Sequence, residues 1–261
     1  MYNLKIILFF GTVFALCNSS AVYKNLNKKC GIDDGDCQRV LYGGILREVL
    51  ENGIPEYNIP KMDPYEVKDL ELSIFGMIKV TMLDGTIAGF KTCKSNTFTT
   101  DIKTARTNIE LVCEGFTYEG NYKAESTPTL LALLGGVNVH ANGKAKVVVE
   151  KLKLNLDFPF VVNKLADCEP HIRLMPEDAI TSYEVLGKLS IDADGMFIGE
   201  QDVSTVAVKI FNENWKVITK MLGPHVLDGG LKVFYTEVTK FFDAVPTKEL
   251  ICDDLTPYVT N

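Results

Sequence analysis

The chain has 261 residues, and 46% of them are hydrophobic, which excludes a disordered chain and allows one large core. The formal net charge is −7 and the pI is about 5.1. This acidic balance argues against nucleic acid, or an anionic membrane surface, as the main partner. No linker divides the chain, so one elongated α+β domain is expected.

The first residues predict a secretory signal peptide. Residues 1–17 contain a lysine and an apolar run from Ile6 to Leu16, which small and polar residues follow. This run is too short to span a bilayer. Cleavage is expected after Cys17, or as late as Ser20, and leaves residues 18–261 as a single domain. We therefore expect a secreted, extracellular protein without integral membrane association. A buried N-terminal strand is the alternative.

The first expected helix covers about residues 38–53. Three carboxylates precede it, where they would cap helix amides, and Gly53 would end it. Two adjacent i, i+4 rows form one amphipathic face: Leu41, Ile45 and Val49, and Tyr42, Leu46 and Leu50. Gly43 and Gly44 lie inside this helix. Either another backbone approaches them or the helix simply tolerates them.

Residues 53–64 read GIPEYNIPKMDP and connect this helix to the next element. Each of the three prolines fixes its own φ and disfavours a helical conformation in the residue before it. Apolar residues stand between the prolines. We expect a stiff, extended hinge that lies against the protein as a wall.

From Leu70 to about Phe160 the apolar period is two. This pattern predicts long strands of an antiparallel sheet with one dry and one wet face. The apolar parity slips between Val149 and Leu152, which predicts a bulge or a bend. Weaker strand signals follow between Ile172 and Ile198.

From about Ser204 the period returns to 3.6, as expected for a long amphipathic helix. One stripe contains Val206, Ile210, Phe211, Trp215, Ile218 and Leu222. Gly223-Pro224 is expected to interrupt it. A second apolar run leads from Leu227 to Val245 and closes at Pro246. Trp215 is the only tryptophan, and it is either a core residue or a cavity wall.

Six cysteines follow the signal peptide: Cys30, Cys37, Cys93, Cys113, Cys168 and Cys252. An even number in an oxidising compartment predicts disulfides, but the sequence does not choose among the pairings. Cys30 and Cys37 close a short acidic loop and are the favoured pair. The three histidines lie apart from these cysteines and there is no CxxC, so no metal site is expected.

Motifs for catalysis are missing from the sequence. It contains no G-x-S-x-G nucleophile elbow, no H-E-x-x-H, no P-loop and no G-x-G-x-x-G after a strand. Each histidine stands without a nucleophile and an orienting group beside it. We therefore expect neither an enzyme nor a cofactor. An esterase is the rejected alternative, because no serine or histidine can be nominated for it.

Three features together resemble the insect haemolymph juvenile hormone-binding protein and takeout family. They are the pair Cys30-GIDDGD-Cys37, the GIPEYNIPKMDP segment, and FNENW at Phe211–Trp215 with the long helix that follows it. The resemblance runs from Cys30 to about Leu250. It also suggests Cys168 as a disulfide cysteine. The partner of Cys168 does not follow from the resemblance, and we take Cys252 as the candidate. Cys93 and Cys113 depart from the takeout pattern.

The resemblance implies a tubular lipid-binding fold, in which a strongly curved antiparallel sheet wraps around the long C-terminal helix and encloses an apolar tunnel. It implies a carrier of a small hydrophobic ligand such as juvenile hormone, another terpenoid or a fatty-acid-like lipid. We expect a monomer in haemolymph or another extracellular fluid, with any receptor unidentified. A secreted signalling protein with a filled core is the alternative, because a filled core and a lined cavity have the same periodicity.

The expected ligand-binding residues come from the apolar faces of the helices and the sheet. They are Leu46, Leu50, Phe75, Val80, Phe90, Phe116, Tyr118, Trp215, Ile218 and Leu222. Tyrosine hydroxyls at Tyr42, Tyr65, Tyr118 and Tyr122 could meet the polar end of a ligand.

Overall fold

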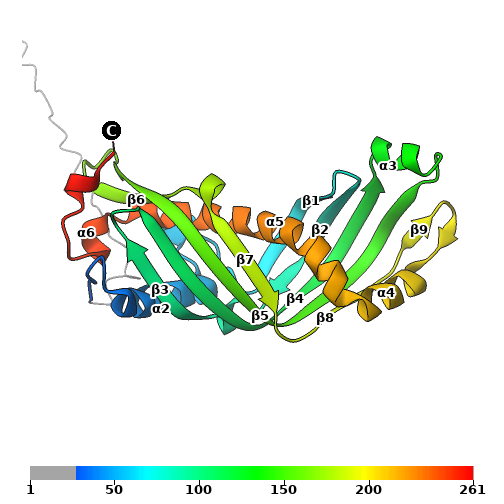
Figure 1. Ribbon diagram of the computed structural model, residues 1–261, viewed down its shortest axis with the longest axis horizontal. Coiled ribbons are helices and arrows are strands. Elements are labelled where there is room, and N and C mark those ends of the chain that lie inside the picture. Colours follow the sequence, from blue (N-terminus) through cyan, green and yellow to red (C-terminus); the bar gives the residue numbers. More distant parts are fainter. Residues whose placement is uncertain (1–27, 261) are drawn as a thin grey trace, which may run out of the picture.

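The computed structural model describes residues 28–260, so the predicted signal peptide and Cys17 lie outside the described residues. One long, strongly curved antiparallel sheet wraps around helix α5 (Trp215–Ala244), which crosses its concave side (Figure 1). This confirms the predicted α+β fold, with an N-terminal helix α2 (Gly35–Asn52) at one end of the molecule.

The sheet is organised around two very long central strands. These are β4 (Arg106–Ser126) and β5 (Val139–Lys164), which pair along almost their whole lengths. Beside β4 lie β3 (Lys94–Asp101) and β2 (Ile78–Ala88), and β1 (Tyr65–Ile74) pairs with β2. Along the other side of β5 lie, in turn, β6 (Pro170–Leu174), β7 (Ile180–Val185), β8 (Leu189–Ala193) and β9 (Met196–Ile198), and β10 (Gln201–Asp202) pairs with β9.

The predicted irregularity between Val149 and Leu152 is confirmed. Leu152 pairs with Cys113 and Glu150 pairs with Gly115, so Glu114 and Lys151 are left out of the register. Lys151 has a φ of 46°, outside the strand region. The register between β4 and β5 is the same on both sides of this unpaired position. Within each strand the apolar pattern moves by one residue here, from Cys113 to Phe116 in β4 and from Val149 to Leu152 in β5, so the apolar side chains stay on the concave face.

The two faces of the sheet differ in chemistry. Ion pairs join β4 to β5 on one face, with Lys153 2.6 Å from Glu110 and Lys146 3.4 Å from Glu119. The side chains that alternate to the other face between these positions are apolar, among them Leu111 and Phe116 of β4 and Val147 and Leu152 of β5. The curvature places that apolar face inward, toward α5.

Helix α2 begins and ends as the sequence predicts. The Asp34 carboxylate accepts a hydrogen bond from the Cys37 amide at 3.0 Å, and Gly53 ends the helix with a φ of 70°. No heavy atom lies within 4 Å of a Cβ built on Gly43, so the helix only tolerates this glycine.

The C-terminal helix is broken at a different place from the one predicted. Helix α4 (Ser204–Glu213) ends at Asn214, whereas α5 continues through Gly223 and Pro224. Pro224 deprives the helix of one amide donor. One turn away, the Tyr183 hydroxyl of β7 donates to the Thr219 carbonyl at 2.6 Å. A Cβ on Gly223 would clash with Tyr183, so the glycine permits this close packing that holds the helix together.

The proline-rich connection is compact, not extended as predicted. Pro55–Tyr57 forms a 3-10 turn, η1, and the amide of Ile54 donates to the Ile59 carbonyl at 2.8 Å. Ile54 and Ile59 are fully buried in the core instead of forming a wall. The buried Asp63 carboxylate accepts from the Lys91 amide at 2.7 Å and from the Gly89 amide, which fastens the connection to the sheet.

The remaining helices are short. They are α3 (Pro128–Leu133), α6 (Thr247–Leu250) and the 3-10 turns η2 (Phe90–Thr92), η3 (Pro176–Asp178) and η4 (Thr256–Tyr258). Along residues 28–260, no helix is both long and apolar enough to cross a membrane.

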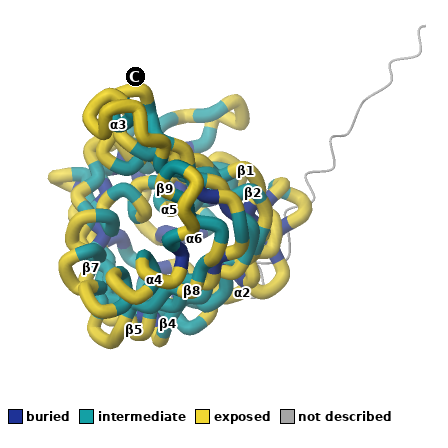
Figure 2. Tube along the Cα trace, turned by 90° about the vertical axis from the view of Figure 1, so that its right-hand side faces the viewer, coloured by how far each residue is buried: buried dark blue, intermediate teal, exposed yellow. Residues whose placement is uncertain are grey.

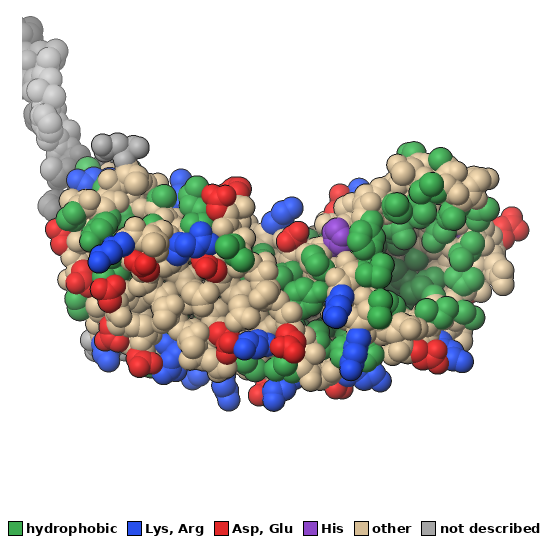
Figure 3. All heavy atoms as spheres, viewed as in Figure 1, with side chains coloured by type: hydrophobic (Ala, Val, Ile, Leu, Met, Phe, Trp, Pro, Cys, Tyr) green, Lys and Arg blue, Asp and Glu red, His purple; other side chains and the backbone are tan. Residues whose placement is uncertain are grey.

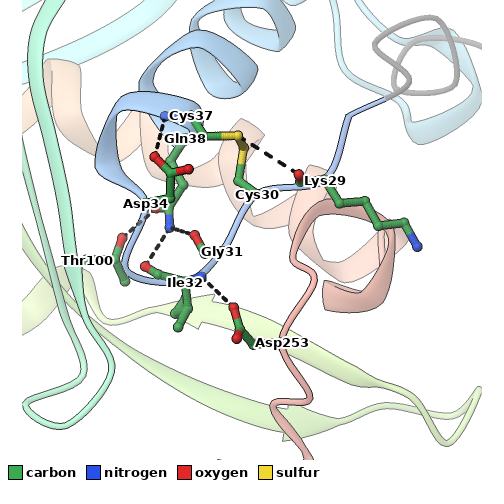
Figure 4. The surroundings of a disulfide bond; sticks show 9 residues. All are labelled: Lys29, Cys30, Gly31, Ile32, Asp34, Cys37, Gln38, Thr100 and Asp253. Atoms are coloured by element: carbon green, nitrogen blue, oxygen red, sulfur yellow. Dashed lines mark hydrogen bonds between the residues drawn. A yellow bond between two sulfur atoms is a disulfide. The ribbon is translucent and has the colours of Figure 1, made fainter.

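Among the cysteines of residues 28–260, two disulfides form and one expected pair does not. Cys30–Cys37 forms as predicted, with a Cα–Cα distance of 5.6 Å, and joins the start of the described chain to α2 (Figure 4). Cys93–Cys113 joins the start of β3 to the middle of β4. The pairing of Cys168 with Cys252 is wrong, because both thiols are free and exposed. Cys168 lies in the β5–β6 turn, whereas the Cys252 amide donates to Cys30 beside α6.

Candidate ligand-binding site

The two ends of the molecule are packed very differently. At the end with α2 and α6, one large cluster of buried side chains fills the space between the helices and the sheet. It includes Leu41, Ile54, Ile59, Phe160, Phe241 and Leu250. The cluster of buried residues toward α3 and β9 is much smaller and consists of Val67, Tyr118, Tyr122, Ala141 and Ala145. We refer to these as the closed end and the open end.

At the open end, apolar residues of the concave face are only half-buried although α4 and α5 lie over the sheet. This holds for Val80 and Met82 of β2, for Phe116 of β4, and for Val147 and Leu154 of β5. In a filled core, such side chains would be enclosed on all sides. Their partial exposure means that the concave face borders open space.

The surface view shows this space directly. At the end near α3 and β9 the molecule is hollowed, and hydrophobic side chains line the hollow (Figure 3). Seen from that end, intermediate and exposed residues predominate on the strands around α4 and α5 (Figure 2). The arrangement can accommodate an apolar molecule along the concave face, with β2, β4 and β5 as one wall and the two helices as another.

The predicted binding residues divide between the two ends. Val80, Phe116 and Tyr118 lie on the concave face, and Trp215, Ile218 and Leu222 are half-buried on α5. Leu46, Leu50 and Phe90 belong to the closed-end core or pack against it. Phe75 is 49% exposed on the β1–β2 turn, where its ring meets that of His225. Parity alone could not separate these positions, because it reports a face and not a depth.

Three tyrosine hydroxyls around the concave face are already engaged in hydrogen bonds. Tyr118 donates to the Asn121 carbonyl at 3.1 Å, Tyr122 to the Asp194 carbonyl at 2.9 Å, and Tyr183 to that of Thr219. Tyr235 of α5 differs, because within residues 28–260 its buried hydroxyl has no hydrogen-bond partner. Sequence reasoning missed this residue, and only its place on the apolar stripe could have suggested it.

Tyr235 stands where the closed end meets the open end. It is 7% exposed and packs edge-on against Phe158, with half-buried Leu154 and Leu231 around the same cluster. Burial raises the pKa of its phenol well above the usual value, and burial together with Asp194 raises the pKa of Tyr122 to about 12. At neutral pH both hydroxyls are therefore protonated and can donate a hydrogen bond.

The polar groups elsewhere are arranged for structure. Both ring nitrogens of the buried His171 are engaged, Nδ1 with the Phe242 carbonyl at 2.7 Å and Nε2 with Asp167 at 2.9 Å. This ring joins α5 to the β5–β6 turn. Throughout the described part of the chain, no three His, Cys, Asp or Glu side chains are grouped to hold a metal ion.

A separate pocket of about 490 Å³ lies between the β8–β9 turn and the start of α4. Three carboxylates border it: Asp192, Asp194 and Asp202. Oxygens of Asp194 and Asp202 accept hydrogen bonds from the amides of Lys144 and Ser204. An apolar ligand would leave these charges desolvated, so this pocket is a poor candidate for the binding site.

The sequence from residue 7 to residue 252 matches the model of the haemolymph juvenile hormone binding protein family. The chain belongs to this family. Its fold is similar to the crystal structure of Takeout 1 from Epiphyas postvittana, with a TM-score of 0.70 and 18% identity over 85% of this chain and 98% of that one. By sequence, no curated protein matches the chain.

Membership of the haemolymph juvenile hormone binding protein family explains the motifs found in the sequence. The Asn212 side chain of FNENW accepts from the Ile191 amide at 2.9 Å and donates to the Ile191 carbonyl at 2.8 Å. The side-chain amide of Asn212 thus makes the two hydrogen bonds that the backbone of a neighbouring strand would make with β8. These bonds fix α4 against the sheet. The family consists of lipid- and hormone-binding carriers, which agrees with an apolar hollow bounded by α4.

Proposed function

We propose that the protein is a secreted carrier, without catalytic activity, that binds a small hydrophobic molecule in the open-end hollow. The observation that carries this proposal is the half-burial of apolar side chains on a sheet face that two helices cover. Such side chains gain about 25 cal/mol per Å² when a ligand removes their surface from water. An apolar ligand gains comparably, so partition is the main driving force.

The walls of the proposed site are Val80, Phe116 and Tyr118 from the sheet and Trp215, Ile218 and Leu222 from α5. Leu46, Leu50 and Phe90 support the closed end and make no direct contact with the ligand in this proposal. Phe75 stands at the rim. The ligand is juvenile hormone, another terpenoid or a fatty-acid-like lipid, and the Tyr235 hydroxyl supplies a polar contact that orients it.

Native mass spectrometry and solvent extraction of the purified protein test this function. The expected result is a co-purifying lipid, or a bound fluorescent hydrophobic probe that terpenoids or fatty acids displace. If no lipid is found and the probe does not bind, the carrier function is wrong. In that case, the alternative function of a secreted signalling protein with a filled core would explain the fold better.

A further inference from the structure

Large apolar side chains are exposed together at the tip of the open end. They are Phe75 and Met77 of the β1–β2 turn, Leu133, Leu134 and Val137 in and after α3, and Ile198 of β9. We call these six residues the apolar tip. Leu133 is the most exposed of them, at 67%. Helix α3 stands out from the rest of the molecule at this end (Figure 1).

The apolar tip is one continuous structure built from three separate segments. The Thr127 amide before α3 donates to the Met77 carbonyl at 2.8 Å, and its hydroxyl donates to Gly76 at 3.0 Å. On the other side, the amide of Gly199, just after β9, donates to the Asn138 carbonyl at 2.7 Å. These bonds fix the three segments relative to one another and bring their exposed apolar side chains to the same end of the molecule.

The three segments carry no formal charge. Residues 72–78, 126–143 and 195–199 contain no Asp, Glu, Lys or Arg, although such residues make up 23% of the chain. On the adjoining strands, Lys79 is paired with Glu71 and Lys123 with Glu125. The exposed Glu200 follows the third segment directly, so the nearest charge to Ile198 in the chain is negative. The tip therefore offers apolar contact beside an acidic edge and would not attract anions.

We propose that the apolar tip docks onto the surface of a neutral or zwitterionic lipid phase, with α3 entering the boundary between headgroups and acyl chains. An uncharged surface made of leucine, phenylalanine and methionine matches a lipid boundary, which takes up apolar side chains without requiring a complementary shape. A net charge of −7 and the missing free cations at the tip exclude attraction to anionic lipid. The association is peripheral.

The location of the tip gives this contact a use. The tip surrounds the hollow end of the molecule, where hydrophobic side chains continue inward (Figure 3). A docked molecule would present the hollow to the lipid phase, so a hydrophobic ligand could pass between them without crossing water. This use rests on the proposed carrier function, whereas the docking itself does not.

Vesicle flotation tests the docking with protein produced through a eukaryotic secretory route, so that any signal peptide is removed. The wild type should float with phosphatidylcholine vesicles, equally well at about 0.01 M and about 1 M salt, because screening acts only on charges. Adding phosphatidylserine should not strengthen it. The double variant Leu133→Ser/Leu134→Ser should bind at least about tenfold more weakly, since it removes two exposed leucines.

The matched control is Val40→Ser/Ile180→Ser, which removes two exposed apolar side chains away from the tip, each more exposed than Leu134. It should bind vesicles like the wild type, and both variants should keep the wild-type melting temperature. The proposal is overturned if the wild type does not float, or if the control loses as much binding as the tip variant. It is also overturned if the tip instead mediates a dimer in lipid-free buffer that the tip variant abolishes.

Probe transfer separates this proposal from the carrier function. The tip variant should bind a fluorescent hydrophobic probe with wild-type affinity but take it up from vesicles several-fold more slowly. A protein that floats but binds no probe would refute the carrier function and leave the docking supported. Equal uptake rates in both proteins would refute the use of the tip in transfer.

Discussion

Tyr235 is the residue whose environment is least explained by folding alone. A buried hydroxyl without a partner costs stability, and Tyr118, Tyr122 and Tyr183 avoid this cost by donating to carbonyl oxygens. Apolar side chains pack around Tyr235, among them Phe158 and Leu231. A buried carboxylate there would be expensive, so a neutral acceptor such as an ester or ketone oxygen suits the site better.

The substitution Tyr235→Phe should therefore separate stability from binding. The free energy of unfolding should stay equal or rise by up to about 1 kcal/mol, because an unpaired polar atom is removed. Affinity for a terpenoid ester should fall about three- to tenfold, the value of one hydrogen bond. Denaturant titration and probe displacement measure the two quantities.

Two comparisons make the Tyr235 result specific. The hydrocarbon with the same skeleton as the ester should bind both proteins equally. Tyr183→Phe should cost about 1 kcal/mol of stability, because its hydroxyl donates to Thr219. If Tyr235→Phe destabilised the protein like Tyr183→Phe, the hydroxyl would have a structural role instead.

At the scale of elements, the molecule depends on local fasteners that hold helices against the sheet. Asn212 joins α4 to β8, Tyr183 joins α5 to β7, and Asp63 joins the connection after α2 to the turn after β2. Asn212 and Asp63 satisfy backbone groups outside a regular ladder or helix, whereas Tyr183 donates to a carbonyl inside α5.

The substitution Asn212→Ala should destabilise the protein by about 1–3 kcal/mol, since two hydrogen bonds to Ile191 are lost in a partly buried place. Helix α4 would also no longer be fixed beside the hollow, where it forms part of the wall. The affinity for the probe should therefore fall together with the stability. Chemical denaturation and probe titration measure both effects.

Asn214 of the same motif provides the comparison for Asn212. Its side chain donates to the Ile210 carbonyl within its own helix, in an exposed place. Asn214→Ala should therefore cost no more than about 0.5 kcal/mol. Equal losses in the two variants would mean that the Asn212 contact with β8 does not hold α4 in solution.

For the whole molecule, the difference between the closed and open ends is the main property. The closed end is a filled core strengthened by Cys30–Cys37, and the open end has a small buried cluster beside a hollow. The closed end should therefore carry most of the stability, while the open end can adapt to a ligand.

Hydrogen exchange should reveal this difference and locate the ligand. Without ligand, amides of α2 should exchange far more slowly than those of α3 and α4, because α2 packs on the filled core. Bound lipid should add protection to α4 and the first half of α5 but little to α2. Strong ligand protection around Leu46 and Leu50 would place the site at the closed end instead.

The sequence by itself determined the order of elements, the caps of α2, the shift of parity in β5 and the Cys30–Cys37 pair. These features depend on neighbours in the chain, and side-chain periodicity records them directly. The motifs that resemble the family could also be recognised in the sequence. The proline-rich segment is a compact loop and not an extended one, because its two isoleucines pack in the core.

Only the tertiary structure decided which apolar faces are filled and which are hollow. It also carried α5 through Pro224 by bringing Tyr183 to Gly223, kept Cys168 apart from Cys252, left Tyr235 without a partner and gathered three uncharged segments into one tip. The physical reason is common to all of them. Periodicity fixes the direction in which a side chain points, whereas depth, proximity and hydrogen-bond partners depend on residues far away in the chain.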